Sequence, residues 1–121
     1  MILYTIGDSF TYGDELDNPK DAWPYLLGNQ FGYEVHNYAR NGASNDYIVK
    51  TTVEYLEYNN PDIVIIGWTT PDRIDIGGKT ATVNYDPIIF KRWNADWARE
   101  KLNTQLTLME KYVLKDYNNF H

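Results

Sequence analysis

A serine follows an apolar segment at the start of the chain, in a setting that suits a nucleophile. Residues 2–6 read ILYTI, and Gly7-Asp8-Ser9 comes directly after them. An apolar, β-branched run predicts a buried parallel strand, and open α/β sheets bind ligands at the carboxyl ends of such strands. Ser9 is therefore a candidate nucleophile. The residues alone leave open that Ser9 and Thr11 only cap a helix or turn.

Two later segments repeat this order of a predicted strand and a polar turn. Residues 33–39 precede the turn NGASN at 41–45, and the apolar residues 62–68 run into the turn GWTT at 67–70. In a parallel sheet with the strand order 2-1-3, the three turns would lie side by side on one edge. Three such turns on one edge favour a catalytic site there more strongly than a single turn would.

Acyl transfer needs a nucleophile and hydrogen-bond donors aimed at the oxygen that becomes negative. The backbone N–H groups of Ser9 and Gly42 could supply two such donors. Glycine suits this position because a bare backbone can come close to a ligand. A side chain from the third turn could supply the third donor.

The spacing of apolar residues predicts the elements that position these turns. Strand, helix, strand, helix, strand in this order indicates a parallel sheet with helices on both faces. The run at 62–68 is continuous enough to be buried on both faces. The predicted strands are 2–6, 33–39 and 62–68, and a hairpin is predicted at 73–85 with its turn at Gly77-Gly78. Two helices are predicted between the strands: one from an N-cap at Asp21 to Phe31, with an apolar face of Trp23, Leu26, Leu27 and Phe31, and one from 44–46 to about Tyr58. A long helix is predicted at 94–118, with the apolar stripe Leu102, Leu106, Met109, Val113 and Phe120.

Composition restricts the class of protein. The 121 residues suggest one domain, and the net charge of -6 with scattered basic residues disfavours nucleic acid and anionic membranes as partners. The absence of cysteine excludes disulfides and thiol catalysis. No signal peptide or membrane-length apolar run is present, so we expect a cytoplasmic protein. No cluster has metal-ligand spacing, and we expect no cofactor.

The three blocks resemble the SGNH, or GDSL-type, hydrolase family over roughly the first 75 residues. They are IGDSFT at 6–11, NGAS at 41–44 and IGWT at 66–69. The resemblance implies a flavodoxin-like three-layer α/β/α fold and hydrolysis of a small acyl or acetyl ester. It also implies Ser9 as nucleophile, Ser9, Gly42 and the third-block residue Thr69 as the oxyanion hole, and a late Asp-x-x-His pair as base and orienting acid.

The chain departs from the family pattern in two places. The third block of the family is Gly-x-Asn-Asp, so Thr69 stands at the asparagine position, where a hydroxyl is a shorter donor than an amide. No Asp-x-x-His is present. His36 falls within a predicted strand, where a structural role is favoured, and His121 follows Asp116 by five residues, which is the wrong spacing. We therefore expect little esterase activity from residues 1–121 and a single domain that is incomplete at its C-terminal end.

The remaining candidates each have a simpler alternative. Asp8, Asn45 and Trp68 could bind substrate, but Asp8 also suits a turn, residues 44–46 suit a helix cap, and Trp68 suits packing. Asp72 and Arg73 could line the rim of the site, although a local surface ion pair is favoured. A second copy of the chain could cover the open edge of the third strand. Two other functions stay open: a non-catalytic binding or assembly module of the same fold, and a phosphate or nucleotide site at Ser9 and Thr11.

Overall fold

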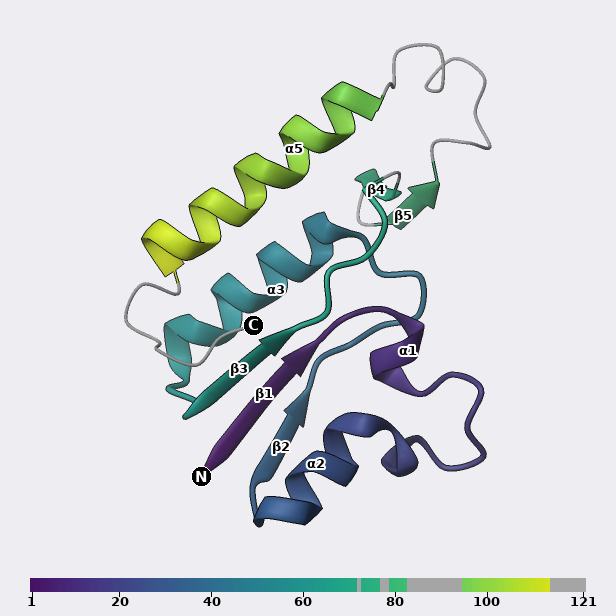
Figure 1. Ribbon diagram of the computed structural model, residues 1–121, viewed down its shortest axis with the longest axis vertical. Helices are drawn as coiled ribbons and strands as arrows, with labels where there is room; N and C mark the ends of the chain where they lie inside the picture. The colour runs from purple at the N-terminus through teal and green to yellow at the C-terminus, as the bar shows by residue number, and fades with distance from the viewer. Residues whose placement is uncertain (72, 77–78, 83–94, 114–121) are drawn as a thin grey trace.

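The structure is a computed structural model, and it describes residues 1–71, 73–76, 79–82 and 95–113 (Figure 1). Some predicted features lie outside these ranges. They are the hairpin turn at Gly77-Gly78, one partner of the predicted Asp72–Arg73 pair, and the residues Asp116, Phe120 and His121.

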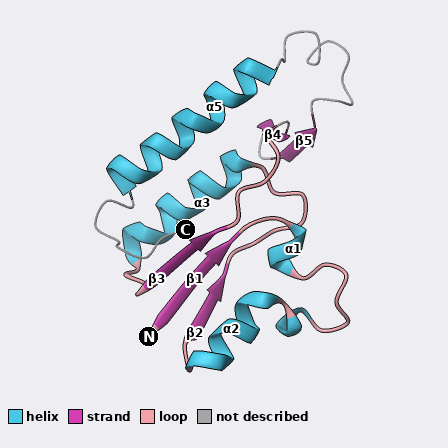
Figure 2. Ribbon diagram, viewed as in Figure 1, coloured by secondary structure: helices cyan, strands magenta, loops and turns pink. Residues whose placement is uncertain are grey.

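Three parallel strands form the sheet that organises the molecule. They are β1 (Ile2–Ile6), β2 (Glu34–Asn37) and β3 (Ile63–Ile66), and their order is β2-β1-β3. Tyr4 of β1 aligns with His36 of β2 and with Val64 of β3. The predicted α/β class and the 2-1-3 strand order are confirmed. Figure 2 shows the three strands side by side between helices.

Helices α2 (Trp23–Phe31) and α3 (Asn45–Tyr58) cover opposite faces of the sheet. On one face, a Cβ added to Gly28 of α2 would collide with the side chain of Val35, so glycine allows the helix to lie close to β2. On the other face, Ile48 of α3 packs with Tyr4 of β1. Side chains alternate between the faces of a strand, and neighbours such as Val35 and His36 therefore meet different helices.

Tyr4 is the centre of the core on the α3 face. Its ring stacks on that of Tyr55, with 4.2 Å between the ring centroids, and its hydroxyl lies 2.9 Å from that of Thr52. Burial raises the pKa of Tyr4 well above its ordinary value, and the Thr52 hydrogen bond only partly opposes this. The cluster also contains Val64 and Met109. Both α3 and the C-terminal segment are thereby attached to β1 and β3.

The expectation that β3 is buried on both faces is wrong. Val64 and Ile66 are buried on the α3 side, whereas Ile63 and Ile65 are only half-buried. Helix α5 (Ala95–Leu108) contacts α3 and lies beside it in Figure 1, so it adds cover to the face that α3 already occupies. The opposite face of β3 has no comparable helix among the described residues.

The hairpin and the C-terminal helix are confirmed in part. Strands β4 (Arg73–Ile76) and β5 (Lys79–Thr82) pair antiparallel at the predicted place. Within the described part of the predicted helix at 94–118, residues of α5 are α-helical and η3 (Met109–Val113) continues them as a π-helix. Within the described ranges, no helix combines the length and the apolar composition that a membrane span needs.

The predicted N-cap of α2 is wrong by one residue. Asp21 is the last residue of a short 3₁₀ helix, η1 (Pro19–Asp21), which Asn18 caps, so the extended Ala22 becomes the residue that flanks α2. The predicted apolar face of this helix is also partly wrong, because Leu26 and Phe31 are 57% and 59% exposed. The helix meets β2 through Gly28 instead.

Candidate active site

The turns that follow the three strands are joined to one another at the carboxyl edge of the sheet. The backbone N–H of Arg40 donates to the carbonyl of Gly7, at 3.2 Å, and links the second turn to the first. The hydroxyl of Thr69 donates to Asp8 at 2.9 Å and links the third turn to the first. The sequence-predicted arrangement of three adjacent turns is therefore present.

Ser9 is the first residue of a four-residue helix, α1 (Ser9–Tyr12). Asp8 caps this helix by accepting the backbone N–H of Phe10 at 3.2 Å, and Gly13 ends it in the left-handed conformation with φ of 88°. The serine is half-buried, and among the residues that the structure describes its hydroxyl has no hydrogen-bond partner. Ser9 lines a hollow in the surface, and no neighbouring base within those residues activates its hydroxyl.

Gly7 permits a close packing of α1 against the ends of β1 and β3. A Cβ on this residue would lie 2.9 Å from the Cβ of Thr11 and 3.2 Å from the carbonyl oxygen of Gly67. Thr11 is buried below the serine turn. A larger residue at position 7 would push α1, and with it Ser9, away from the sheet.

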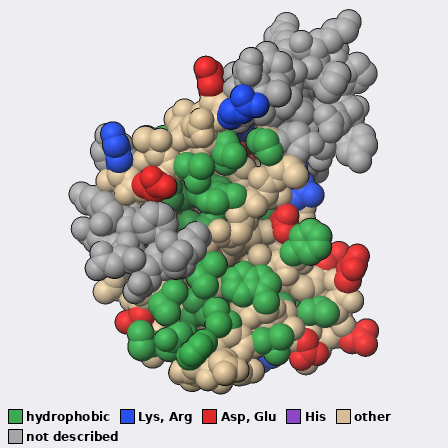
Figure 3. Space-filling model, in the orientation of Figure 1, with side chains coloured by type: hydrophobic (Ala, Val, Ile, Leu, Met, Phe, Trp, Pro, Cys, Tyr) green, Lys and Arg blue, Asp and Glu red, His purple; other side chains and the backbone are tan. Residues whose placement is uncertain are grey.

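Two hollows flank the serine turn. Ser9 lines one of about 430 Å³, whose apolar walls include Phe10, Leu16, Trp23 and Leu26 and whose other lining residues are Gly13, Asp14, Glu15, Asp21 and Ala22. Figure 3 shows acidic side chains over the segment between α1 and α2, close to this hollow, and apolar side chains over α2. This hollow can take a small acyl group beside an acidic rim.

The second hollow has a volume of about 480 Å³ and lies over the third turn. Asp8, Phe10, Thr11 and residues 67–70 line it. Trp68, predicted to bind substrate, contributes to this wall and is half-buried against the core. Its side chain is therefore both a packing residue and a wall of the hollow.

Gly42 lies in the second turn with φ of 69°, the left-handed region that favours glycine. The turn is closed by a hydrogen bond of 3.1 Å from the N–H of Ala43 to the carbonyl of Arg40. A Cβ on Gly42 would meet no atom within 4 Å, so the backbone there faces open space. Gly42 is thus available to a ligand, as an oxyanion donor must be.

Thr69 is buried, and its donor groups are used inside the protein. Its backbone N–H donates to Asn45 Oδ1 at 2.9 Å, and Asn45 Nδ2 donates to the Thr69 carbonyl at 3.1 Å. Its single hydroxyl proton is directed to Asp8. Asn45, a predicted substrate contact, is 3% exposed and positions Thr69 through this reciprocal pair.

Arg73 contacts all three turns, a more central place than the rim position that the sequence left open for it. Its Nη1 lies 3.0 Å from Thr69 Oγ1, 3.3 Å from the carbonyl oxygen of Ala43 and 3.7 Å from Asp8 Oδ2. The sequence favoured a local ion pair with Asp72 over a place at the rim of the site. The signal for the more central role is the cation four residues after Thr69, at the start of the hairpin.

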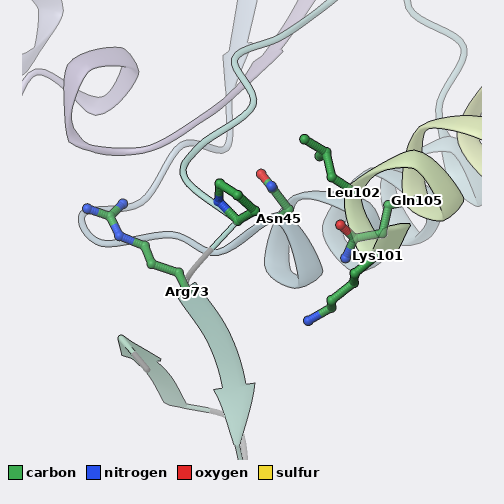
Figure 4. Close-up of a pocket in the computed structure, with 6 residues that line it drawn as sticks. Asn45, Arg73, Lys101, Leu102 and Gln105 are labelled. Atoms are coloured by element: carbon green, nitrogen blue, oxygen red, sulfur yellow. The ribbon is translucent and has the colours of Figure 1, made fainter. Parts of the chain in front are cut away.

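A narrow pocket lies on the other side of Arg73. Figure 4 shows Asn45 and Arg73 on one side of it and Lys101, Leu102 and Gln105 of α5 on the other. Lys101 and Gln105 both donate to Asp46, at 2.8 and 2.7 Å. These bonds attach α5 to the start of α3.

Helix α3 begins where the second turn ends. Ser44 caps it by accepting the N–H of Tyr47 at 3.1 Å, as predicted, and donates its own proton to Asp75 of β4 at 2.7 Å. The cap therefore also fixes the hairpin that carries Arg73.

His36 has partners on both ring nitrogens. Nδ1 lies 2.6 Å from the hydroxyl of Tyr55, and Nε2 lies 3.3 Å from a carboxylate oxygen of Glu34. The side chain faces α3 from within β2, which fits the structural role expected for it. His121 lies outside the described residues.

Three solved structures show a similar arrangement of strands and helices. The esterase EstA from Pseudoalteromonas sp. superposes with a TM-score of 0.58 at 13% identity, over 90% of this chain and 53% of its own. A protein from Desulfitobacterium hafniense DCB-2, assigned to the G-D-S-L lipolytic family, gives 0.56 at 22% over 90% and 53%. The SGNH-hydrolase family esterase AlinE4 gives 0.57 at 16% over 93% and 54%.

The chain shares its α/β fold with these three proteins. It spans about half the length of these three solved structures. No family model matches it. The likeness confirms the α/β architecture implied by the three sequence blocks, while the roles of Ser9, Gly42 and Thr69 stay predictions.

Proposed function

We propose that the chain is part of a serine ester hydrolase of the SGNH type, with Ser9 as nucleophile and a small acyl or acetyl ester as substrate. The observation that carries the proposal is the placement of Ser9. Its half-buried hydroxyl follows β1, lines a hollow of about 430 Å³ and adjoins two further turns. The likeness to the esterases EstA and AlinE4 supports the same reaction class.

The roles in this reaction follow from the chemistry of ester cleavage. Ser9 Oγ attacks the ester carbonyl, and the alcohol leaves as the acyl group is transferred to serine. The N–H groups of Ser9 and Gly42 would stabilise the negative oxygen, with a third donor from the Thr69 turn. Water then releases the acid and regenerates the hydroxyl.

Activation of Ser9 is the step for which the described residues offer no base. A serine needs a base to become a good nucleophile, and the sequence has only His36 and His121. His36 is held by Tyr55 and Glu34. We therefore propose that residues 1–121 alone hydrolyse esters very slowly.

The test supplies the missing base from solution. Hydrolysis of p-nitrophenyl acetate is measured with increasing imidazole for the parent chain, for Ser9→Ala, and for Thr107→Ala on the exposed side of α5 as a control hydroxyl deletion. Positioned base catalysis contributes large factors, so we expect imidazole to raise the parent rate at least about tenfold above that of Ser9→Ala. Mass spectrometry should find the acetyl group on Ser9, and Thr107→Ala should match the parent.

A non-catalytic binding module is the second candidate function. The commitment of the Thr69 hydroxyl to Asp8 favours it, because that proton is then not directed to a substrate. Equal rates for the parent and Ser9→Ala at every imidazole concentration, without acetylation of Ser9, would decide for the binding module.

A further inference from the structure

The Arg73 guanidinium joins the three turns of the candidate site at one nitrogen. Nη1 donates to Thr69 Oγ1 at 3.0 Å and to the Ala43 carbonyl at 3.3 Å, and it lies 3.7 Å from Asp8 Oδ2. Asp8 precedes the candidate nucleophile, Ala43 follows Gly42, and Thr69 occupies the third block. The side chains of Arg73 and Asp8 are 28% and 19% exposed, so their attraction is only partly screened by water.

The bonds of Thr69 give Arg73 a role beyond holding loops together. The Thr69 hydroxyl accepts from a cation and donates to a carboxylate, and such chains polarise the intermediate hydroxyl. An O–H polarised in this way is a stronger donor than a free threonine hydroxyl. The hydroxyl can rotate about the Cβ–Oγ1 bond while Arg73 continues to donate to its oxygen.

We propose that Arg73 is a positioning residue that converts Thr69 into the third oxyanion donor. When a negative oxygen occupies the space between Ser9 and Gly42, the Thr69 proton turns from Asp8 toward it. Asp8 keeps the Phe10 N–H and the nearby guanidinium, which compensate for the lost hydrogen bond. The inference rests on the proposed function, because it assumes that the corner binds the tetrahedral anion of ester hydrolysis.

The position of Arg73 argues against direct contact with substrate. It lines neither hollow beside the serine turn and instead lines the small pocket toward α5. Its effect on a bound anion should therefore pass through Thr69. This predicts that removing both residues costs no more affinity than removing either one.

The test measures binding of methylphosphonate, a tetrahedral anion, by titration of the backbone amide signals of Ser9, Gly42 and Thr69. We expect Arg73→Met and Thr69→Val each to weaken binding roughly tenfold or more, the range of one hydrogen bond to a charged group. The double variant should bind as weakly as the single ones, and Arg73→Lys should recover part of the affinity. Lys50→Met, which removes a positive charge from the exposed side of α3, should bind like the parent.

Three results would overturn the inference. They are no binding of methylphosphonate to the parent, unchanged affinity in Arg73→Met, and losses that add in the double variant, which would mean that Arg73 acts by charge alone. Amide spectra and melting temperatures of each variant separate these results from misfolding.

The outcome is distinguishable from that of the proposed function. Arg73-independent binding together with acetylation of Ser9 refutes only the role of Arg73. Arg73-dependent binding without acetylation refutes only the esterase.

Discussion

The carboxylate of Asp8 stabilises the turn that carries Ser9. It accepts the N–H of Phe10 and the hydroxyl of Thr69 and lies beside Arg73. These partners fit the turn-forming role expected of an aspartate at this position. The position of Ser9 therefore depends on Asp8, which is fixed in turn by Thr69 and Arg73.

Gly7 is the residue at which a single methyl group should disturb this arrangement. We expect Gly7→Ala to destabilise the protein by about 1–3 kcal/mol, the usual cost of overpacking, because its Cβ would press on Thr11 and on the Gly67 carbonyl. Urea unfolding measures the change, and the amide signal of Ser9 should move. Asn29→Ala, at an exposed position of α2, is the control. A loss for Gly7→Ala no greater than that of the control would refute this packing argument.

Sequence patterns predicted that the three turns lie together, but not the hydrogen bonds that join them. Ser9, Gly42 and Thr69 could be selected because each follows a predicted strand, and parallel strands end at one edge. Arg73 could be proposed only as a rim residue, because its partners Ala43 and Thr69 meet it only after the hairpin folds back over the turns. The reciprocal pair of Asn45 and Thr69 was hidden for the same reason.

The buried phenol of Tyr4 joins β1 to α3. The raised pKa of Tyr4 means that the folded protein keeps this proton at a pH where the unfolded chain loses it. The contribution of Tyr4 is therefore fully present below the ordinary tyrosine pKa of about 10, and it is lost as pH rises from there toward the folded pKa.

Tyr4→Phe tests this dependence. We expect the variant to lose about 1 kcal/mol at neutral pH, from the hydrogen bond to Thr52, and to show a flatter decline of stability between about pH 9.5 and 11. Unfolding free energies measured across that range give both quantities. Parallel pH profiles for the parent and the variant would assign the alkaline decline to other tyrosines.

The limits of elements were less predictable than their order. Local residues alone determine the apolar runs of β1 and β3 and the cap at Ser44, so these features could be predicted. The start of α2 depends on whether Asp21 ends the preceding 3₁₀ helix or caps α2. Both helices have a proline near their start, so the local residues allow either boundary. The exposure of Leu26 and Phe31 depends on which side of α2 meets β2, which spacing alone does not determine.

Strand β3 forms an uncovered edge of the described sheet. Among the described residues it pairs with β1 only, and Ile63 and Ile65 are half-buried. An apolar strand with an unpaired edge tends to associate with another chain. This supports the proposal that a second copy covers the edge.

Sedimentation velocity over a range of concentrations tests this association. We expect the chain to self-associate, and Ile65→Lys to raise the dissociation constant at least about tenfold, because a charge would have to be buried beside the second copy. Thr104→Lys, at an exposed position of α5, adds the same charge elsewhere and should associate like the parent. A chain that stays monomeric at every concentration would refute the proposal.

The bond between the second turn and the segment after α1 also bears on how the protein ages. Asn41 is exposed, its amide donates to Asp14 Oδ1 at 2.5 Å, and the residue after it is Gly42. An exposed asparagine before glycine is the sequence most prone to spontaneous deamidation, since glycine lets the following nitrogen attack the side-chain amide. The product would set a carboxylate against that of Asp14 and, in part, insert an isopeptide link before Gly42. Old preparations would therefore accumulate a second species altered at the very turn that the proposed oxyanion site depends on.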